Sequence, residues 1–115
     1  MIPPNSNAGV YVLRSVNGTA LPYQIFRLGA DNIVLTSDTV TLTDGGAFTE
    51  IYVERTTQAG AVTNNTTTIR GTYTVSGTAV TIAFTSQAGG YTGTITGQTL
   101  TLAVRGDLSF LFGKR

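Results

Sequence analysis

The residues with the most chemical potential lie in one short segment, Phe48-Thr49-Glu50-Ile51-Tyr52-Val53-Glu54-Arg55. In a β-strand alternate side chains share a face, so Phe48, Glu50, Tyr52 and Glu54 lie on one side and the other four residues on the opposite side. If Phe48 faces a protein interior, Glu50 and Tyr52 face it as well. A buried carboxylate needs a partner or remains protonated, so this strand predicts an unusual polar group inside the fold.

Two arginines are candidates for that partner. Arg14 has the same parity as Val12 and Val16, and Arg70 has the parity of two neighbouring threonines. An interior Glu–Arg–Tyr set would orient the polar head group of a ligand. Two simpler outcomes are open: a β-bulge that turns both glutamates outward, or a salt bridge near the rim of the fold.

Other chemistry finds little support in the residues. The chain has neither His nor Cys, which excludes Ser-His-Asp and Cys-His triads and disulfides and leaves only carboxylates for a zinc site. Asp31, Asp38 and Asp44 each lie beside a predicted turn, where Asp bonds to its own backbone, with an oxygen-ligated Ca²⁺ site as the alternative. No phosphate-binding loop is present. We therefore predict no catalytic residue, no metal and no cofactor.

The composition is that of one all-β domain outside the cytosol. The 115 residues suffice for a single core, with 1–8 as an extended lead-in and 9–115 as the domain. Only 11% of residues are charged, and 22 threonines stand against a single lysine. Thr suits strands whose outer face meets water. A net charge of +1 gives no electrostatic case for nucleic acid, and no apolar run is long enough for a membrane helix.

Short apolar runs separated by turn residues predict strands over 10–16, 23–28, 33–36, 40–43, 48–57, 66–75, 79–85, 91–96, 99–104 and 108–112. Asn17-Gly18 is the clearest hairpin turn. The segments 33–36 and 40–43 form either one strand broken near Ser37-Asp38 or two short strands. The chain turns again at either Gln58-Ala59-Gly60 or Asn64-Asn65. A further turn is expected at Gly106-Asp107.

Alternation in the second half of the chain identifies the inward residues, which are Val80, Ile82, Phe84, Tyr91, Ile95, Leu100, Leu102, Val104, Leu108, Phe110 and Phe112. The first and last strands are partly apolar on both faces, so we expect them to pair with each other. Short connections make sequence neighbours antiparallel, and closure removes exposed edges. The predicted fold is therefore a closed antiparallel up-and-down β-barrel of about eight strands.

Four segments, taken in their order along the chain, resemble the motifs of a known protein family. Residues 9–18, 44–48, 71–82 and 93–102 are similar to the opening strand, the D-G-x-F strand start and two glycine-bounded hairpins of small bacterial lipocalin-like domains. The resemblance implies an eight-stranded calycin-type barrel with Phe48 facing inward, in a group whose members are mostly exported or lipid-anchored. Tyr11 stands where true lipocalins commonly have Trp, and no C-terminal helix is expected.

These observations favour an exported binding module for a modest apolar or amphipathic ligand. The expected interior site comprises Arg14, Phe48, Glu50, Tyr52, Arg70, Tyr73, Phe84 and Phe110. One alternative is a structural or adhesion barrel with a filled core, and another is an isomerase- or cyclase-like enzyme that uses Glu50 or Glu54. A cavity of about 300 Å³ or more would favour the binder.

We expect a monomer in the periplasm or outside the cell, since no large apolar surface patch is predictable. The same expectation allows a lipid anchor on the full-length precursor. Met1-Ile2-Pro3-Pro4-Asn5 lacks the features of a signal peptide. Export therefore implies that the sequence starts after a cleavage site, with Met1 added.

Overall fold

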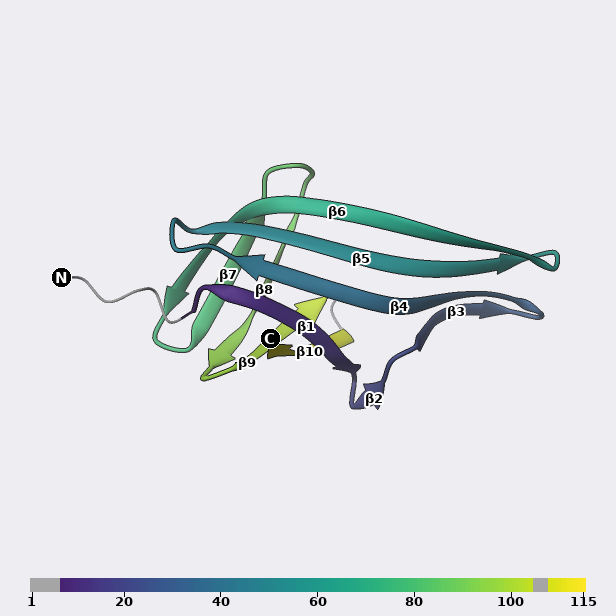
Figure 1. The fold of residues 1–115 in the computed structure, drawn as a ribbon, viewed down its shortest axis with the longest axis horizontal. Helices are drawn as coiled ribbons and strands as arrows, with labels where there is room; N and C mark the ends of the chain where they lie inside the picture. Colours follow the sequence, from purple (N-terminus) through teal and green to yellow (C-terminus); the bar gives the residue numbers. More distant parts are fainter. Residues whose placement is uncertain (1–6, 105–107) are drawn as a thin grey trace.

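The computed structural model describes residues 7–104 and 108–115, and within them the protein is entirely β-structure (Figure 1). The strands are β1 Gly9–Val16, β2 Thr19–Ala20, β3 Tyr23–Leu28, β4 Asp31–Leu42, β5 Ala47–Gln58, β6 Ala61–Ser76, β7 Ala79–Phe84, β8 Gly90–Thr96, β9 Thr99–Val104 and β10 Leu108–Lys114. No helix that could cross a membrane occurs in these two segments. Most of the predicted lead-in and the predicted turn at Gly106-Asp107 lie outside the described residues.

Eight strands form a closed antiparallel barrel, as predicted. Strands β4 to β10 pair in sequence order, and β1 closes the ring by pairing with β10 on one side and β4 on the other. Tyr11 opposes Lys114 of β10 and Val40 of β4. The expected pairing of the first and last strands is therefore confirmed, and β1 has no free edge along its first half.

Strands β2 and β3 depart from a simple up-and-down order. Asn17 and Gly18 both have positive φ (50° and 83°), the geometry that the Asn-Gly turn requires, but the turn leads only into the two-residue strand β2. The chain then leaves the barrel, and β3 pairs with β4 instead of β1. The two extra strands make the order β2-β1-β10-β9-β8-β7-β6-β5-β4-β3.

The long strands β4, β5 and β6 extend beyond the barrel and form a projecting sheet with β3, which Figure 1 shows as the long arm of the molecule. This arm lengthens the described part of the molecule along one direction. The connection between β5 and β6 is the tight turn at Ala59 and Gly60, so the first of the two predicted turns is confirmed. The alternative turn at 64–65 is wrong, because those asparagines lie inside β6 and pair with β5.

The predicted break near Ser37-Asp38 is also wrong, since β4 is one continuous strand of 12 residues. Its pairing with β5 shifts by one position between Leu35 and Ser37, which is a β-bulge. The extra residue changes the alternation, so Leu35 and Asp38 both face the interior although three positions separate them.

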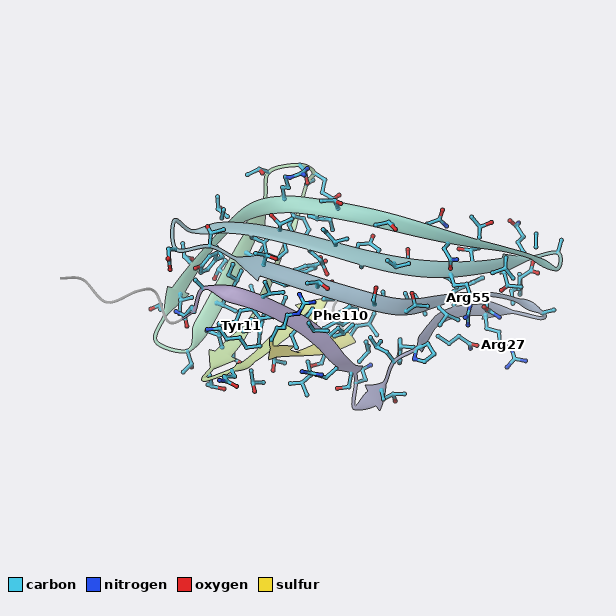
Figure 2. The ribbon with its side chains drawn as sticks, in the orientation of Figure 1. Tyr11, Arg27, Arg55 and Phe110 are labelled. Carbon is cyan, nitrogen blue, oxygen red and sulfur yellow. The ribbon has the colours of Figure 1, made fainter. Side chains whose placement is uncertain are left out.

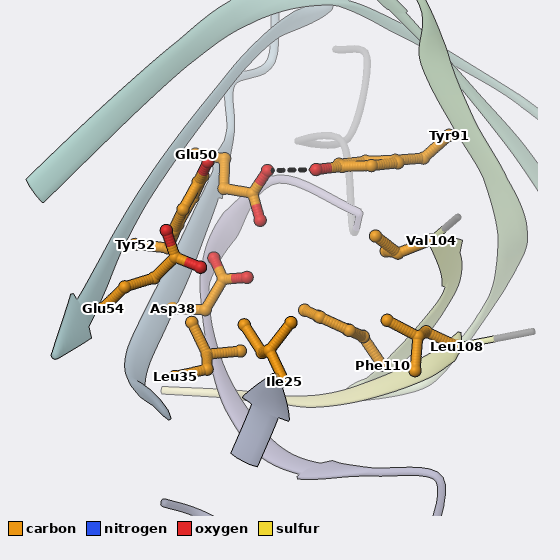
Figure 3. Close-up of a pocket in the computed structure, with 10 residues that line it drawn as sticks. All are labelled: Ile25, Leu35, Asp38, Glu50, Tyr52, Glu54, Tyr91, Val104, Leu108 and Phe110. Carbon is orange, nitrogen blue, oxygen red and sulfur yellow. Dashed lines mark hydrogen bonds between the residues drawn. The ribbon is translucent and has the colours of Figure 1, made fainter. Parts of the chain in front are cut away.

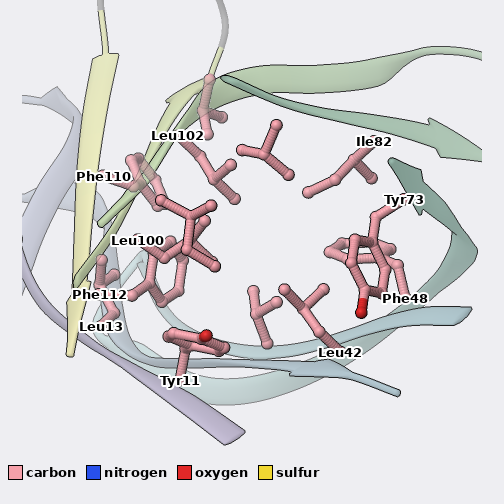
Figure 4. Packing of buried hydrophobic residues seen from close by; sticks show 14 of the residues in the cluster. Tyr11, Leu13, Leu42, Phe48, Tyr73, Ile82, Leu100, Leu102, Phe110 and Phe112 are labelled. Carbon is pink, nitrogen blue, oxygen red and sulfur yellow. The ribbon is translucent and has the colours of Figure 1, made fainter. Parts of the chain in front are cut away.

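The barrel core matches the predicted inward residues (Figure 4). The inward side chains of β7, β9 and β10 form one cluster with Tyr11, Leu13, Leu42 and Phe48. Two inward glycines permit close approach of neighbouring strands. A Cβ at Gly71 would overlap the carbonyl oxygen of Ala83, and one at Gly93 would overlap that of Thr101. These glycines bring strands together instead of leaving free space.

Candidate functional site

Among the described residues, buried hydrophobic side chains pack the barrel interior up to the end where β4 and β5 continue into the projecting sheet. A cavity of about 60 Å³ lies there (Figure 3). Its lining residues are Ile25, Leu35, Asp38, Glu50, Tyr52, Glu54, Tyr91, Val104, Leu108 and Phe110. Figure 3 shows the carboxylates on one wall and the apolar side chains of β9 and β10 on the opposite wall. The cavity therefore has one acidic side and one apolar side.

Strand β5 carries the acidic wall because its register is regular through the barrel. Glu50 opposes Val40 on β4 and Ile69 on β6, both of which are buried. Glu50 itself is 1% exposed, and Glu54 is half-buried further along the same face. The expected inward orientation of Phe48, Glu50 and Tyr52 is confirmed. The register shift in the pairing of β5 with β4 places its extra residue on β4, so it does not turn the glutamates of β5 outward.

Tyr91 of β8 reaches across the barrel to Glu50. Its Oη donates a hydrogen bond of 2.7 Å to Oε1 of Glu50. The Tyr91 ring packs edge-on against Phe84 with 4.8 Å between ring centroids, and Phe48 lies next to both rings. Burial, followed by the negative charge of Glu50, raises the pKa of the Tyr91 hydroxyl. The tyrosine thus remains a hydrogen-bond donor at any physiological pH.

Asp38 faces the same cavity from β4 and is only 1% exposed. Burial is the main cause that raises the pKa of Asp38 to about 11, and the hydrogen bond and charge of Glu50 act in the same direction. Asp38 is therefore protonated at neutral pH, beside the carboxyl group of Glu50. The Oδ1 atom of Asp38 is buried and has no hydrogen-bond partner. This oxygen is an unused acceptor at the base of the cavity.

Neither predicted arginine lines the cavity beside Asp38 and Glu50, which we call the acid pair. Arg14 and Arg70 are both exposed on the outside of the barrel. A register shift between Leu13 and Ser15 of β1 breaks the parity that placed Arg14 inward. On β6 the regular alternation puts Ile69 inside and Arg70 outside. The predicted Glu–Arg–Tyr set is therefore wrong, and the set that exists is Asp–Glu–Tyr.

The other predicted site residues divide into two groups. Tyr52 and Phe110 line the cavity, whereas Phe48 and Phe84 lie behind it as packing for Tyr91. Tyr73 lies away from the cavity and donates a 2.6 Å hydrogen bond to the carbonyl oxygen of Thr43. The residues that the sequence did not identify as a site are Asp38, Tyr91 and the apolar lining.

Two of the three aspartates lie beside turns, as predicted, although the hydrogen bond of Asp31 is not to its own turn. Asp44 lies in the exposed turn between β4 and β5. Asp31 Oδ1 accepts a 3.0 Å hydrogen bond from the backbone N–H of Ala59, so it braces the adjacent turn. Asp38 does not belong with them. Its signal in the sequence is the alternation of Asp38 with Val40 and Leu42, which places a carboxyl in a row of core residues.

The inner face of the barrel continues outward along the projecting sheet. Ile33 lies two residues before Leu35 on β4 and points the same way, and its cross-strand partner is Phe26 of β3. Leu28 follows on the same face. A second, open cavity of about 260 Å³ lies here, lined by Phe26, Leu28, Asp31, Asn32, Ile33, Thr56, Thr57 and Gln58. We call the surface formed by Ile25, Phe26, Leu28, Ile33 and Leu35 the apolar track.

The track is largely uncovered. Phe26 is 50% exposed and Leu28 is 70% exposed. Figure 2 marks the two arginines of the projecting sheet, Arg27 and Arg55. Arg27 is adjacent to both Phe26 and Leu28, and Arg55 opposes Val34, which is adjacent to Ile33, so both arginines belong to the opposite face. None of the described residues that line either cavity is a Lys or Arg.

Comparison with solved structures finds a likeness in fold. A crystal structure of a lipocalin-like protein from Bacteroides uniformis superposes with a TM-score of 0.56, and the match covers 96% of this chain and 100% of that one at 18% identity. No protein-family model matches the sequence, and no curated protein matches it. The chain therefore has a lipocalin-like fold, as its hairpin motifs suggested.

Proposed function

We propose that this lipocalin-like barrel binds one small amphipathic ligand at its open end. The observation that carries the proposal is the continuity between the apolar track and the acid pair. The apolar track is about 13 Å long, measured along β4 from Leu35 to the position opposite Leu28. It leads to a cavity whose far wall is formed by Asp38 and Glu50. A ligand with a polar head and an apolar body matches both parts at once.

The cavity volume limits how the ligand sits. About 60 Å³ holds a few water molecules or a small head group and lies far below the 300 Å³ or more of sites that enclose a whole ligand. The body must therefore lie outside the barrel, along the track. The same small volume argues against the isomerase- or cyclase-like alternative, because no room remains for an enclosed substrate beside Glu50.

Titration with 1-octanol, followed through backbone amide NMR shifts, tests this proposal. We expect saturable shifts that cluster at Ile25, Leu35 and Phe110, together with weaker binding in Ile33→Ser. The matched control is Ile51→Ser, because Ile51 is exposed on the outer face of the neighbouring strand. No saturable shifts with octanol or its charged relatives, or equal weakening by both variants, would contradict binding at the track.

A second candidate is a structural or adhesion barrel that acts through its surface. The filled core favours it, as do the exposed Phe26, Leu28 and Val62 on the projecting sheet. Light scattering over a concentration series tests this candidate alongside the expectation of a monomer. A constant monomer mass supports the binder, whereas association that Phe26→Ser abolishes would support a surface role and contradict the monomer.

Export remains part of the proposal. The low share of charged residues, 11%, and the abundance of Thr support it. Fractionation of the native host with an antibody against this domain tests the periplasmic or extracellular location. Recovery with the cytosolic fraction would contradict it.

A further inference from the structure

We infer that the head group of the ligand is a cation, specifically an alkylammonium group seated between Asp38, Glu50 and Glu54. This inference rests on the proposed function and adds the chemical class of the ligand. The direct observation behind it is the Oδ1 atom of Asp38, which is buried, faces the cavity and lacks a hydrogen-bond partner. An ammonium N–H group is the donor that this oxygen lacks.

The charges of the residues that line the cavity also favour a cationic head group. Strand β4 contributes Asp38, β5 contributes Glu50, Tyr52 and Glu54, and β8 contributes Tyr91. The remaining lining from β3, β9 and β10 is apolar and has no titratable group. Figure 3 shows the three carboxyl groups turned toward one space, with Tyr91 bonded to Glu50 at its edge. The described residues of the site thus supply negative charge and acceptors and include no Lys or Arg side chain.

Other head groups fit less well. A carboxylate or phosphate head would bring a further negative charge against Glu50 and Glu54, and none of the described lining residues is an arginine or lysine that could receive it. Within the described residues no three potential ligands converge closely enough to hold a metal ion, and a bare ion would leave the apolar track unused. A neutral hydroxyl would satisfy Asp38 Oδ1 but would not offset the charge of the pair.

Binding of an ammonium group also changes the proton balance of the acid pair. The empty pair shares one proton, and the arriving cation supplies both the positive charge and the N–H donors that this proton provided. Asp38 then loses its proton to solvent, so one cation enters and up to one proton leaves. No covalent bond forms or breaks. Apparent affinity should therefore rise with pH, by at most tenfold per unit, while the amine stays protonated.

The experiment compares octylammonium, 1-octanol and octanoate on the intact protein by calorimetry at pH 7.5. We expect octylammonium to bind about tenfold more tightly than octanol, since charge-assisted hydrogen bonds are roughly twice as strong as neutral ones. Octanoate should bind more weakly than octanol. Repeating the titration in two buffers of different ionisation enthalpy should show release of a fraction of a proton to one proton per octylammonium and none for octanol.

Asp38→Asn should remove the proton release and most of the preference for the ammonium. The control is Asp44→Asn, an acid in an exposed turn, which should retain both. If Asp38→Asn fails to fold, proton release by the unmodified protein still decides the matter. Equal affinities for octanol and octylammonium without proton release would overturn the cation while leaving the amphipathic binder intact. Absence of binding by all three probes would overturn both.

Discussion

Asp38 makes the stability of this protein depend on pH in an unusual direction. A carboxyl group in an unfolded chain titrates near pH 4, whereas in the folded protein burial and Glu50 raise the pKa of Asp38 to about 11. The folded state therefore holds one more proton than the unfolded state between these values. The stabilisation by that proton is complete below about pH 4 and is lost progressively as the pH rises toward 11.

The size of the effect follows from linkage. One extra proton in the folded state lowers the free energy of unfolding by up to about 1.4 kcal/mol for each pH unit, or about 4 kcal/mol between pH 5 and pH 8. Asp38→Asn removes this dependence, because an amide has the shape of the protonated acid and retains a donor toward Glu50. We expect the variant to match the unmodified protein near pH 4 and to be the more stable of the two at pH 8.

Urea denaturation at half-unit steps from pH 4 to pH 8 measures the difference between the two curves. Other acids such as Glu54 contribute equally to both proteins and cancel in that difference. Asp44→Asn should run parallel to the unmodified protein, because Asp44 is exposed in a turn. If the Asp38→Asn curve also runs parallel, Asp38 ionises in the folded state and the account of a shared proton is wrong.

Three further outcomes follow from the packing and the register. Tyr91→Phe keeps the ring against Phe84 but removes the donor to Glu50, so it should cost about 1–3 kcal/mol in urea unfolding; a change below about 0.3 kcal/mol would show that water replaces the hydroxyl. Gly93→Ala should cost about 1–3 kcal/mol or more, since its Cβ would overlap a carbonyl oxygen of β9, while Gly45→Ala has open space and should lie within about 0.5 kcal/mol of the unmodified protein. Equal melting temperatures for the two glycine variants would contradict the close strand approach. Light scattering should return the monomer mass at all concentrations, and a mass that rises with concentration would contradict the expected monomer.

The second half of the barrel was predictable because its strands alternate without interruption. Leu100, Leu102 and Val104 alternate with polar or small residues, and all three are buried. Tight glycine turns delimit these strands, so both the face and the ends of each strand follow from local chemistry. The orientation of Glu50 was predictable for the same reason, once Phe48 was placed inside.

Two of the errors occur where a bulge interrupts the alternation. One extra residue between Leu35 and Ser37 places Asp38 inside, whereas a strict period of two starting from Leu35 would place it outside. The register shift between Leu13 and Ser15 places Val16 inside, so Arg14 no longer shares a face with Val16 and lies outside, as alternation from the buried Leu13 requires. A bulge is set by pairing with a strand distant in sequence, so the local pattern carries no mark of it.

The projecting sheet was missed for a different physical reason. Residues 61–68 of β6 are mostly Thr and Asn and bury almost nothing, so they have no apolar face to reveal a strand. Their extended form depends on pairing with β5, a strand of 12 residues that ends at the turn of Ala59 and Gly60. Hydrogen bonding to a neighbour, and not burial, defines this element.

The acid pair is where stability and binding make opposite demands. A buried carboxyl pair without a cation is costly, and a neutral or apolar replacement of similar shape is commonly neutral or stabilising. The same pair lines the cavity at the point where the barrel interior meets the apolar track. Asp38→Asn therefore separates the two roles in one protein. A gain in stability at pH 8 together with loss of the ammonium preference would mean that the cost of the pair serves binding, whereas a gain in stability with binding unchanged would show that the ligand does not touch it.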